Sequence, residues 1–550
     1  MFNKNFAKQL SVAALTAVMS FSTIACSFTG DSDVVPDEPV LAPVVDVVPD
    51  SEPEVKLVPY IEETEEGEEY FVFVGNEETG NGVEVSSIAP IADISKVKIT
   101  DLDALKKQLV QLPNLVYIDM CDCDVSNEDM EDLMATFPNI RFVWKIYMNA
   151  TNEYRTLYWS CRTDALAFST LHAFATDPRL VNDDAQQFKY CTDLVAYDVG
   201  HNAVYDVNFL ANMPNLHILI MVDDYDRVHH CKFNDLSPIA ANTKLMYLEF
   251  FVSNVSDISF LQYMPYMTDL NISYSGVKDS TYLYDLPSIE RLFMESTGIP
   301  YSEFEKLVDL YPDAQLEYYG TGSVDHGWRS HPRYFAMIDM YRNNYWNDLF
   351  RTEEELADVA TYDMLVIGKK RYYGTSYTYS GEVTDDMIGG FISSRVENNT
   401  IPKQSGECNF DALGHAYTKD TGNGAILVMM EDGKYHWFYY NEVLARLLRE
   451  KLDENGHTIE PSTLTEEEIF APKPDPDEVA EEVSGDDESG DEASDDEVSD
   501  GDASDSEVSD GDASDGGVSD SEVSDGDASD GGVSDSDADS ADGTDDGSDD

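Results

Sequence analysis

Three stretches of the sequence hold residues that could do chemistry. The segment Asp223–Cys231 carries acidic, histidine and cysteine side chains, which are ligands for divalent metals. Asp325 and His326 lie close to His331, and Asp385, Asp386 and Glu407 are acids without an evident base or nucleophile. In each case we favour a plainer interpretation: a solvated polar loop, a segment that pins a cap through Trp328, and surface carboxylates.

Sequence motifs of the common enzyme classes are absent. The chain contains no G-x-S-x-G, no H-E-x-x-H, no Walker loop and no strand-linked G-x-G-x-x-G. Cys121 and Cys123 are too close in sequence for an easy metal pair. We therefore predict a protein that is not an enzyme and has no cofactor and no metal site, with a hydrolase site within 352–455 as a remote alternative.

The cysteines offer a second kind of chemistry. Six remain if Cys26 is used for lipidation, and they show no regular framework. Unpaired, mostly buried thiols are the interpretation we favour, although export would permit disulfides. Cys161 and Cys191 are the first pair to test, because together they bracket one insertion.

The charge of the chain excludes one class of partner. Its formal net charge is −75, from 34 basic and 109 acidic residues, so phosphate backbones would be repelled and nucleic acid is not expected as a ligand. From Ser494–Asp495 to Ser534–Asp535 a Ser-Asp pair recurs every five residues. Such a segment cannot bury enough apolar surface to fold, so we predict a disordered acidic tail over 461–550.

The N-terminus has the features of an export signal. Lys4 and Lys8 precede an apolar stretch that ends at Cys26, and no charge occurs between Lys8 and Asp31. We predict a lipoprotein-type signal peptide over 1–26, with Cys26 as the lipidated residue, and a Pro- and acid-rich tether over 27–60. These features predict an extracellular protein anchored by lipid to the cell membrane.

A repeated pattern dominates the middle of the chain. Five segments share the form L-x-x-L-x-L, and their first positions are Leu194, Leu216, Leu245, Met267 and Ile289, spaced by 22, 29, 22 and 22 residues. An outlying copy begins at Leu115. The pattern places apolar side chains on one face of a short strand and directs the alternate positions to the other face. Because a single repeat cannot bury its apolar face, neighbouring repeats must stack into a solenoid.

The segments that link the repeats resemble those of one protein family. Asp235-Leu236-Ser237-Pro238-Ile239 and Met213-Pro214-Asn215-Leu216 resemble the return and entry segments of internalin-type leucine-rich repeats. Over about 100–320 the chain is therefore similar to internalin-type surface lipoproteins of Firmicutes. The resemblance implies an α/β solenoid with a curved parallel sheet, and binding by its concave strand face. The insertion after the second strand and the interruption between Trp144 and Phe188 depart from the family pattern.

The regions that flank the repeats complete the domain organisation. Helices expected over Asp101–Val110, Asn127–Phe137 and Phe304–Tyr311 resemble the caps that terminal repeats need. We predict a leucine-rich-repeat domain over 61–322, a C-terminal cap over 323–350 and a small α+β module over 351–460. The module loosely resembles a β-rich unit of surface lipoproteins, and this resemblance implies no activity.

The outward positions of the strands supply the candidate binding site. If Leu245, Leu248 and Phe250 point inward, then Tyr247 and Phe251 must point outward. Large apolar groups with an acidic rim mark interaction surfaces. The candidate concave-face residues are Ile218, Ile220, Tyr247, Glu249, Phe251, Asn271, Tyr274, Arg291 and Phe293. The alternative is that the C-terminal module, or a second copy of the chain, permanently covers this patch.

Two functions from different classes remain open. The first is a surface binding or adhesion protein that takes a protein or glycan partner on the concave face. The second is a structural surface protein that acts through its tether and acidic tail. The sequence does not identify the ligand, the oligomeric state or any Ca²⁺ binding by the tail.

Overall fold

The computed structural model describes residues 70–151, 156–170, 180–222, 233, 235–320, 325–453 and 456–470. The described residues do not include the predicted signal peptide, Cys26, the tether or the tail from 471 onward. They also exclude most of the insertion that was considered for metal binding. Of that insertion's metal-ligand candidates, Asp223–Cys231, none is among the described residues. No helix in the described ranges is long and apolar enough to cross a membrane.

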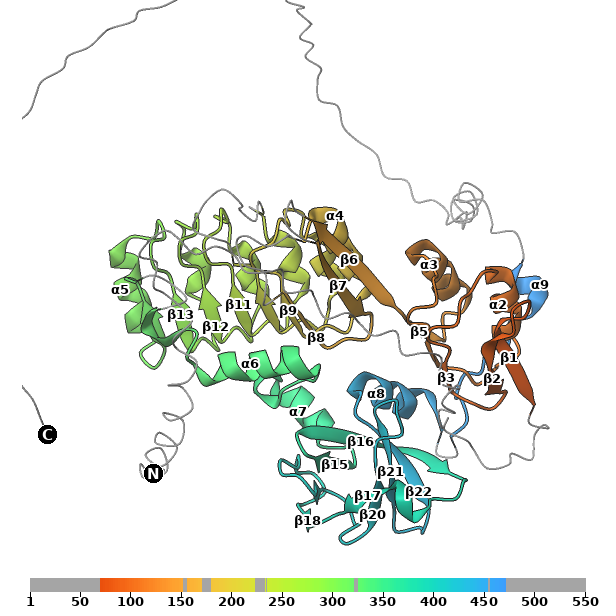
Figure 1. Ribbon diagram of the computed structural model, residues 1–550. Helices are drawn as coiled ribbons and strands as arrows, with labels where there is room; N and C mark the ends of the chain where they lie inside the picture. Colours follow the sequence, from red (N-terminus) through yellow and green to blue (C-terminus); the bar gives the residue numbers. More distant parts are fainter. Residues whose placement is uncertain are drawn as a thin grey trace, which may run out of the picture. The chain divides into compact units, whose positions relative to one another are not determined.

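The repeats form parallel strands, as the spacing predicts. A seven-stranded sheet comprises β8 (Ala167–Ser169), β9 (Ala196–Asp198), β10 (Ile218–Ile220), β11 (Tyr247–Glu249), β12 (Asp269–Asn271), β13 (Arg291–Phe293) and β14 (Gln315–Glu317), in this spatial order. Tyr247 pairs with Ile218 on one side and with Asp269 on the other, so each repeat stacks in register on the next. This is the leucine-rich-repeat solenoid of the α/β class (Figure 1).

Short helices form the opposite wall of the solenoid. They are η1 (Gln186–Tyr190), η2 (Asn208–Asn212), η3 (Ser237–Ala241), η4 (Ser259–Tyr263) and η5 (Thr281–Leu283), with α4 (Asn182–Ala185) near the start and α5 (Tyr301–Leu310) at the end. Between the two walls lies one apolar core, to which the leading repeat positions contribute. Leu248 and Phe250 are fully buried there, so the inward register predicted from the sequence is confirmed.

The N-terminal repeats form a second, smaller parallel sheet. It consists of β3 (Ile91–Asp93), β4 (Tyr117–Asp119) and β5 (Arg141–Val143), backed by α2 (Leu102–Leu109) and α3 (Asn127–Thr136). The hairpin β1 (Phe71–Asn76)–β2 (Asn81–Ser86) covers its outer end. A second hairpin, β6 (Lys145–Thr151)–β7 (Thr156–Arg162), separates the two sheets and accounts for part of the interruption after Trp144.

Four strands of the seven-stranded sheet, β9, β11, β12 and β13, are each followed by a residue with a left-handed backbone. His201, Val252, Tyr274 and Ser296 occupy the same position in successive repeats, with φ of 62°, 55°, 54° and 54°. The amide of Tyr274 donates to the Glu295 carbonyl at 2.8 Å, and Val252 donates to Ser273 at 3.1 Å. The turn therefore joins each repeat to the next by a backbone hydrogen bond. In the repeat that contains Asn202, the side-chain amide also donates to the Val199 carbonyl at 3.1 Å.

The C-terminal module is a mixed α+β unit, as predicted. Its eight-stranded sheet has the order β17 (Ile388–Phe391), β20 (Ala416–Thr418), β21 (Ala425–Met429), β22 (Tyr435–Tyr439), β16 (Lys370–Tyr379), β15 (Met364–Ile367), β19 (Glu407–Cys408) and β18 (Ser394–Arg395). The helices α7 (Glu353–Val359) and α8 (Glu442–Lys451) flank it, and η8 (Asp385–Met387) precedes β17. The strands β21 and β22 meet at an Asp-Gly hairpin turn in which Gly433 has φ of 79°.

The described structure continues beyond the predicted end of the module at residue 460. Residues 456–470, which include α9 (Glu466–Ile469), run back along the N-terminal repeats. The Ser462 amide donates to the Pro113 carbonyl at 2.9 Å, and the Thr458 hydroxyl donates to Asn114 at 2.8 Å. The expected start of the disordered tail at 461 is therefore too early for residues 461–470, which pack through Leu464 and Ile469.

Candidate functional site

The predicted concave-face residues share one face of the sheet but do not face solvent. Most of them are nearly inaccessible: Ile218, Tyr247, Glu249, Asn271 and Phe293 are 0% exposed, Ile220 is 2%, Phe251 3% and Arg291 3%, while Tyr274 is half-buried. The expectation that they would be open to a partner is wrong. The register was predicted correctly. The face is covered from within the chain, but by residues 325–350 and not by the module or a second copy, which were the predicted alternatives.

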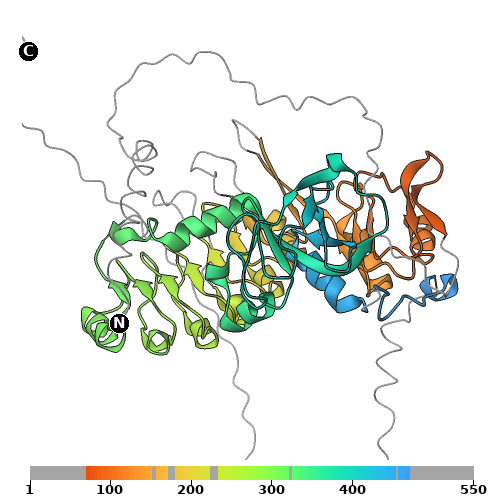
Figure 2. The ribbon, with the colours of Figure 1, turned by 90° about the horizontal axis from the view of Figure 1, so that it is seen from below.

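The cover is the chain's own cap segment, which we define as residues 325–350. Its helix α6 (Pro332–Asn343) runs across the strands of the seven-stranded sheet, as both views show (Figures 1 and 2). Trp328 is fully buried and its ring lies 5.4 Å from that of Tyr247 and 4.9 Å from that of Phe293. Met337, Met340 and Phe350 complete the same apolar cluster. The aromatics selected as a binding patch are thus a second core.

Buried ion pairs fix the cap segment to the polar positions of the same face. Arg329 donates to Glu249 at 2.6 Å, and Arg333 donates to Asp269 at 3.1 Å. Arg291 donates to Asp269 and to the Trp328 carbonyl, and its guanidinium stacks 4.3 Å from the Trp328 ring. Because an unpaired buried charge is very costly, these acids and arginines hold the cap in one position.

The histidines near Trp328 do not form a metal site. His326 lies 3.1 Å from Glu295 and 3.3 Å from Glu317, and His331 accepts a hydrogen bond from the Arg333 amide at the start of α6. Burial lowers the pKa of His331. Across the described parts of the chain, no group of three or more His, Cys, Asp or Glu side chains could hold a metal ion. Trp328 of this stretch is fully buried against the strand face, where it contacts Tyr247 and Phe293.

The module covers the smaller N-terminal sheet in the same way. Leu444, Ala445 and Leu448 of α8 belong to one apolar cluster with Tyr117 and Val143 of the three-stranded sheet. The Asn441 amide donates to Asp164 at 3.0 Å, and the Tyr117 hydroxyl donates to the same carboxylate at 2.9 Å. Both sheets therefore have their concave side closed by elements from the C-terminal part of the chain.

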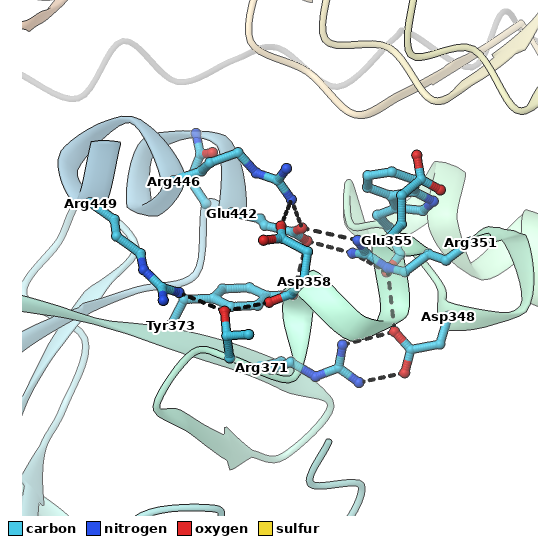
Figure 3. A network of polar contacts seen from close by, with 12 residues as sticks. Asp348, Arg351, Glu355, Asp358, Arg371, Tyr373, Glu442, Arg446 and Arg449 are labelled. Carbon is cyan, nitrogen blue, oxygen red and sulfur yellow. Dashed lines mark hydrogen bonds and ion pairs between the residues drawn. The ribbon is translucent and has the colours of Figure 1, made fainter. Parts of the chain in front are cut away.

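A buried ionic network joins the cap segment to the module (Figure 3). Arg351 donates to both oxygens of Glu442, at 3.0 and 2.5 Å, and Tyr373 donates to Glu442 at 2.9 Å. Arg371 makes a second bidentate ion pair, with Asp348, through hydrogen bonds of 2.9 and 2.8 Å. Burial alone would raise the pKa of Asp348, but the hydrogen bonds and charge of Arg371 hold it below its usual value. Both carboxylates are thus fixed points of the junction, each held by a bidentate arginine.

A second ionic contact joins the module to the repeats. His217 is fully buried and lies 2.9 Å from Glu355 and 2.6 Å from the Asn215 carbonyl, through its two ring nitrogens. Both ring nitrogens therefore have a polar partner in this buried position. Lys244 donates to Glu355 at 2.7 Å. Burial would raise the pKa of Glu355, but His217 and Lys244 together hold it well below its usual value.

An open pocket of about 310 Å³, the junction pocket, lies beside this network. Tyr345, Trp346 and Tyr440 supply aromatic walls, and Asp348 and Arg371 reach it from the ionic network. Lys369 and Lys403 stand at the same pocket and are exposed. Aromatic walls with a few convergent polar groups are typical of ligand sites. No sequence motif marked these residues, since they come from the cap segment, β15–β16 and the end of β22.

Two of the acids considered for hydrolysis make hydrogen bonds within their own turns. Glu407 accepts hydrogen bonds from the amides of Lys403 and Gln404, at 2.7 and 3.2 Å. Asp386 interacts with Thr384, and this hydrogen bond lowers the pKa of Asp386. These contacts hold Glu407 and Asp386 in two local turns.

Comparisons with known proteins found a resemblance to some solved structures. No protein-family model matches the chain, and no curated protein does. The solved structures that resemble it include the internalin InlF of Listeria monocytogenes, 16% identical over 42% of this chain and 68% of that one, with a TM-score of 0.24. Internalin C2 of the same organism is 17% identical over 28% and 69%, with a TM-score of 0.21. A leucine-rich-repeat protein of Leptospira interrogans is 13% identical over 39% and 45%, with a TM-score of 0.22.

Proposed function

We propose that this chain is a non-catalytic binding protein of the cell surface, which takes a protein or glycan partner at the junction pocket. The observation that carries the proposal is the convergence of Tyr345, Trp346 and Tyr440 on one open pocket, while the strand face is closed. In this arrangement the solenoid is the scaffold, and its concave side is used to hold the cap segment and the module.

The chemistry of the pocket suits a partner with both apolar and anionic groups. The aromatic rings offer flat apolar surfaces, as sugar rings or aromatic side chains require. The exposed Lys369 and Lys403 side chains lie at the pocket, beside Asp339 and the arginine-paired acids Asp348 and Glu442. The two lysines favour an anionic group on the partner.

The strand face remains a second location for binding, but only after a rearrangement. Binding there would require α6 and Trp328 to leave Tyr247, Phe251 and Phe293. The variants Tyr247→Ala, Phe251→Ala and Phe293→Ala would then lose fold stability together with any binding at this face. For that reason these variants report on the packing of the cap segment more directly than on the binding of a partner.

A binding screen followed by titration tests the location. The full chain is screened against immobilised glycans and candidate surface proteins, and any partner is titrated against Tyr345→Ala and Lys403→Ala. We expect each variant to weaken binding by about 1–2 kcal/mol, while Lys278→Ala, an exposed lysine on the repeats, binds like the wild type. Equal binding by all of these variants would exclude the junction pocket. If no ligand binds saturably, the structural role through the tether and acidic tail is favoured.

The attachment to the cell is a separate part of the proposal. The apolar segment before Cys26 and the Pro-rich segment after it support lipidation and an extracellular position. In cells labelled with a fatty-acid analogue, we expect Cys26→Ala to abolish incorporation. Unchanged labelling of that variant would contradict the lipid anchor.

A further inference from the structure

Two cysteine side chains from different elements meet inside the solenoid core. Cys161 lies on β7 and Cys191 directly follows η1, and they are 4% and 0% exposed. Their sulfurs approach the same acceptor, the carbonyl oxygen of Arg162, at 3.3 and 3.9 Å. Because both thiols approach this one carbonyl oxygen, the two side chains lie close together in the core, and proximity is the first requirement of a disulfide.

The other described cysteines lack such a neighbour. Cys123 donates to the Ile94 carbonyl at 3.1 Å, and Cys408 donates to the Phe410 carbonyl at 3.2 Å. Cys121 accepts from the Arg162 guanidinium at 3.2 Å. Each of these sulfurs has its own partner, so Cys161 and Cys191 are the one pair among the described cysteines that shares an acceptor.

We propose that Cys161 and Cys191 form a disulfide bond in the exported protein, which fastens the β6–β7 hairpin to the repeat that contains β9. The bond would join two parts of the core on either side of β8. The proposal goes beyond partner binding and does not depend on the junction pocket.

The bond forms by thiol–disulfide exchange with a small-molecule or protein disulfide. One thiolate attacks that disulfide, giving a mixed disulfide and releasing one thiol. The second cysteine then attacks the mixed disulfide, so that the Sγ–Sγ bond forms and the carrier leaves as a second thiol. Two protons and two electrons pass from the cysteine pair to the carrier. Burial, together with the neighbouring Cys161, raises the pKa of Cys191, so exchange is expected before this core closes during folding.

Peptide mapping tests the bond directly. The full chain is isolated from exporting cells with N-ethylmaleimide present, and a second sample is unfolded, reduced and refolded with oxidised and reduced glutathione. Trypsin places Cys161 in peptide 156–162 and Cys191 in peptide 190–227, each with a single cysteine. We expect these peptides to be linked in both samples and separated by reductant. Alkylated or glutathione-capped peptides in both samples, without the link, would overturn the proposal.

A melting experiment tests the fastening role. Reductant should lower the melting temperature of the wild type and of Cys408→Ala, which keeps the pair. The double variant Cys161→Ala/Cys191→Ala should melt at one temperature with and without reductant. If the linked wild type melts at the same temperature before and after reduction, the bond does not fasten the core. A reductant effect that persists in the double variant would assign the effect to other cysteines.

Discussion

At the scale of single residues, the charged side chains of the strand face have a role that differs from the predicted one. Glu249 and Arg291 were selected as part of a polar binding surface, yet each is paired with a group of the cap segment. A sequence shows that a position faces away from the core, but it does not show what covers that position. The partner residue Arg329 lies 80 positions from Glu249 along the chain, beyond any local pattern.

The Glu355 contact gives a prediction for stability and its pH dependence. Glu355→Gln removes the charge that faces His217 and Lys244, so we expect the free energy of unfolding at pH 7 to fall by about 2–3 kcal/mol. A carboxyl group with a depressed pKa stabilises the fold above its ordinary pKa, 4.5, and this contribution is lost as the pH falls further. The difference between wild type and variant should therefore shrink from pH 5 to pH 3 in urea unfolding.

A neighbouring acid on the same helix provides the control for this prediction. Glu353 begins α7 and is exposed, so Glu353→Gln should change the free energy of unfolding by less than about 0.5 kcal/mol. A wild-type-like Glu355→Gln at pH 7 would mean that the His217 contact does not hold the module to the repeats.

At the scale of elements, regular repeats were predictable and degenerate ones were not. For β9 to β13 the first position of the repeat pattern is Leu, Met or Ile, and the pattern identified all five strands from the sequence. The strand β8 has Ala165 there and β14 has Asp313, so neither shows the apolar pattern although both pair in register. The strand β3 has Ala89 and Ala92 where β4 has Leu115 and Ile118. Terminal and interrupted repeats can use small or polar residues because they pack against hairpins and caps.

The helix α6 gives a prediction for the cover of the strand face. Trp328→Ala should lower the free energy of unfolding by about 3–5 kcal/mol, because it empties the centre of a buried aromatic cluster. Phe335→Ala, on the same segment but 55% exposed, should cost less than about 1 kcal/mol. Thermal unfolding measures both. Limited trypsin digestion should cleave the Trp328 variant faster after Arg329 and Arg333, and equal cleavage of the two variants would contradict the cover.

At the scale of the whole molecule, the domains predicted as consecutive units share their cores. The cap segment, the module and residues 456–470 each pack on a different part of the repeats. Composition and periodicity located these regions along the chain, but they could not show that each region packs on the repeats. The residues that dock, such as Leu444 of α8 and Tyr117 of β4, are distant in sequence and follow ordinary amphipathic patterns.

Truncation tests whether residues 456–470 belong to the folded body. A chain that ends at Pro472 should melt like the full chain, because the composition of the remaining segment predicts no packing. A chain that ends at Asp453 should lose about 2–4 kcal/mol, since Leu464, Ile469 and two backbone-directed hydrogen bonds no longer reach the N-terminal repeats. Chemical unfolding of the two truncated chains provides the comparison, and equal stability would mean that this segment binds only weakly.

The two ends of the described body meet at one helix, and this has a mechanical consequence. The Tyr70 hydroxyl donates to the Gln111 carbonyl just after α2, at 2.9 Å, and the Lys107 ammonium of α2 lies 5.3 Å from the centre of the Phe470 ring. Tension applied between residues 70 and 470 would therefore load this small neighbourhood first. The segment 456–470 would detach before any repeat was stretched. The stacked strands therefore bear no load as long as the contacts of Tyr70 and Phe470 with this helix region remain. In a single-molecule pulling experiment, the first extension event should be short and should disappear when the chain is pulled from residue 453.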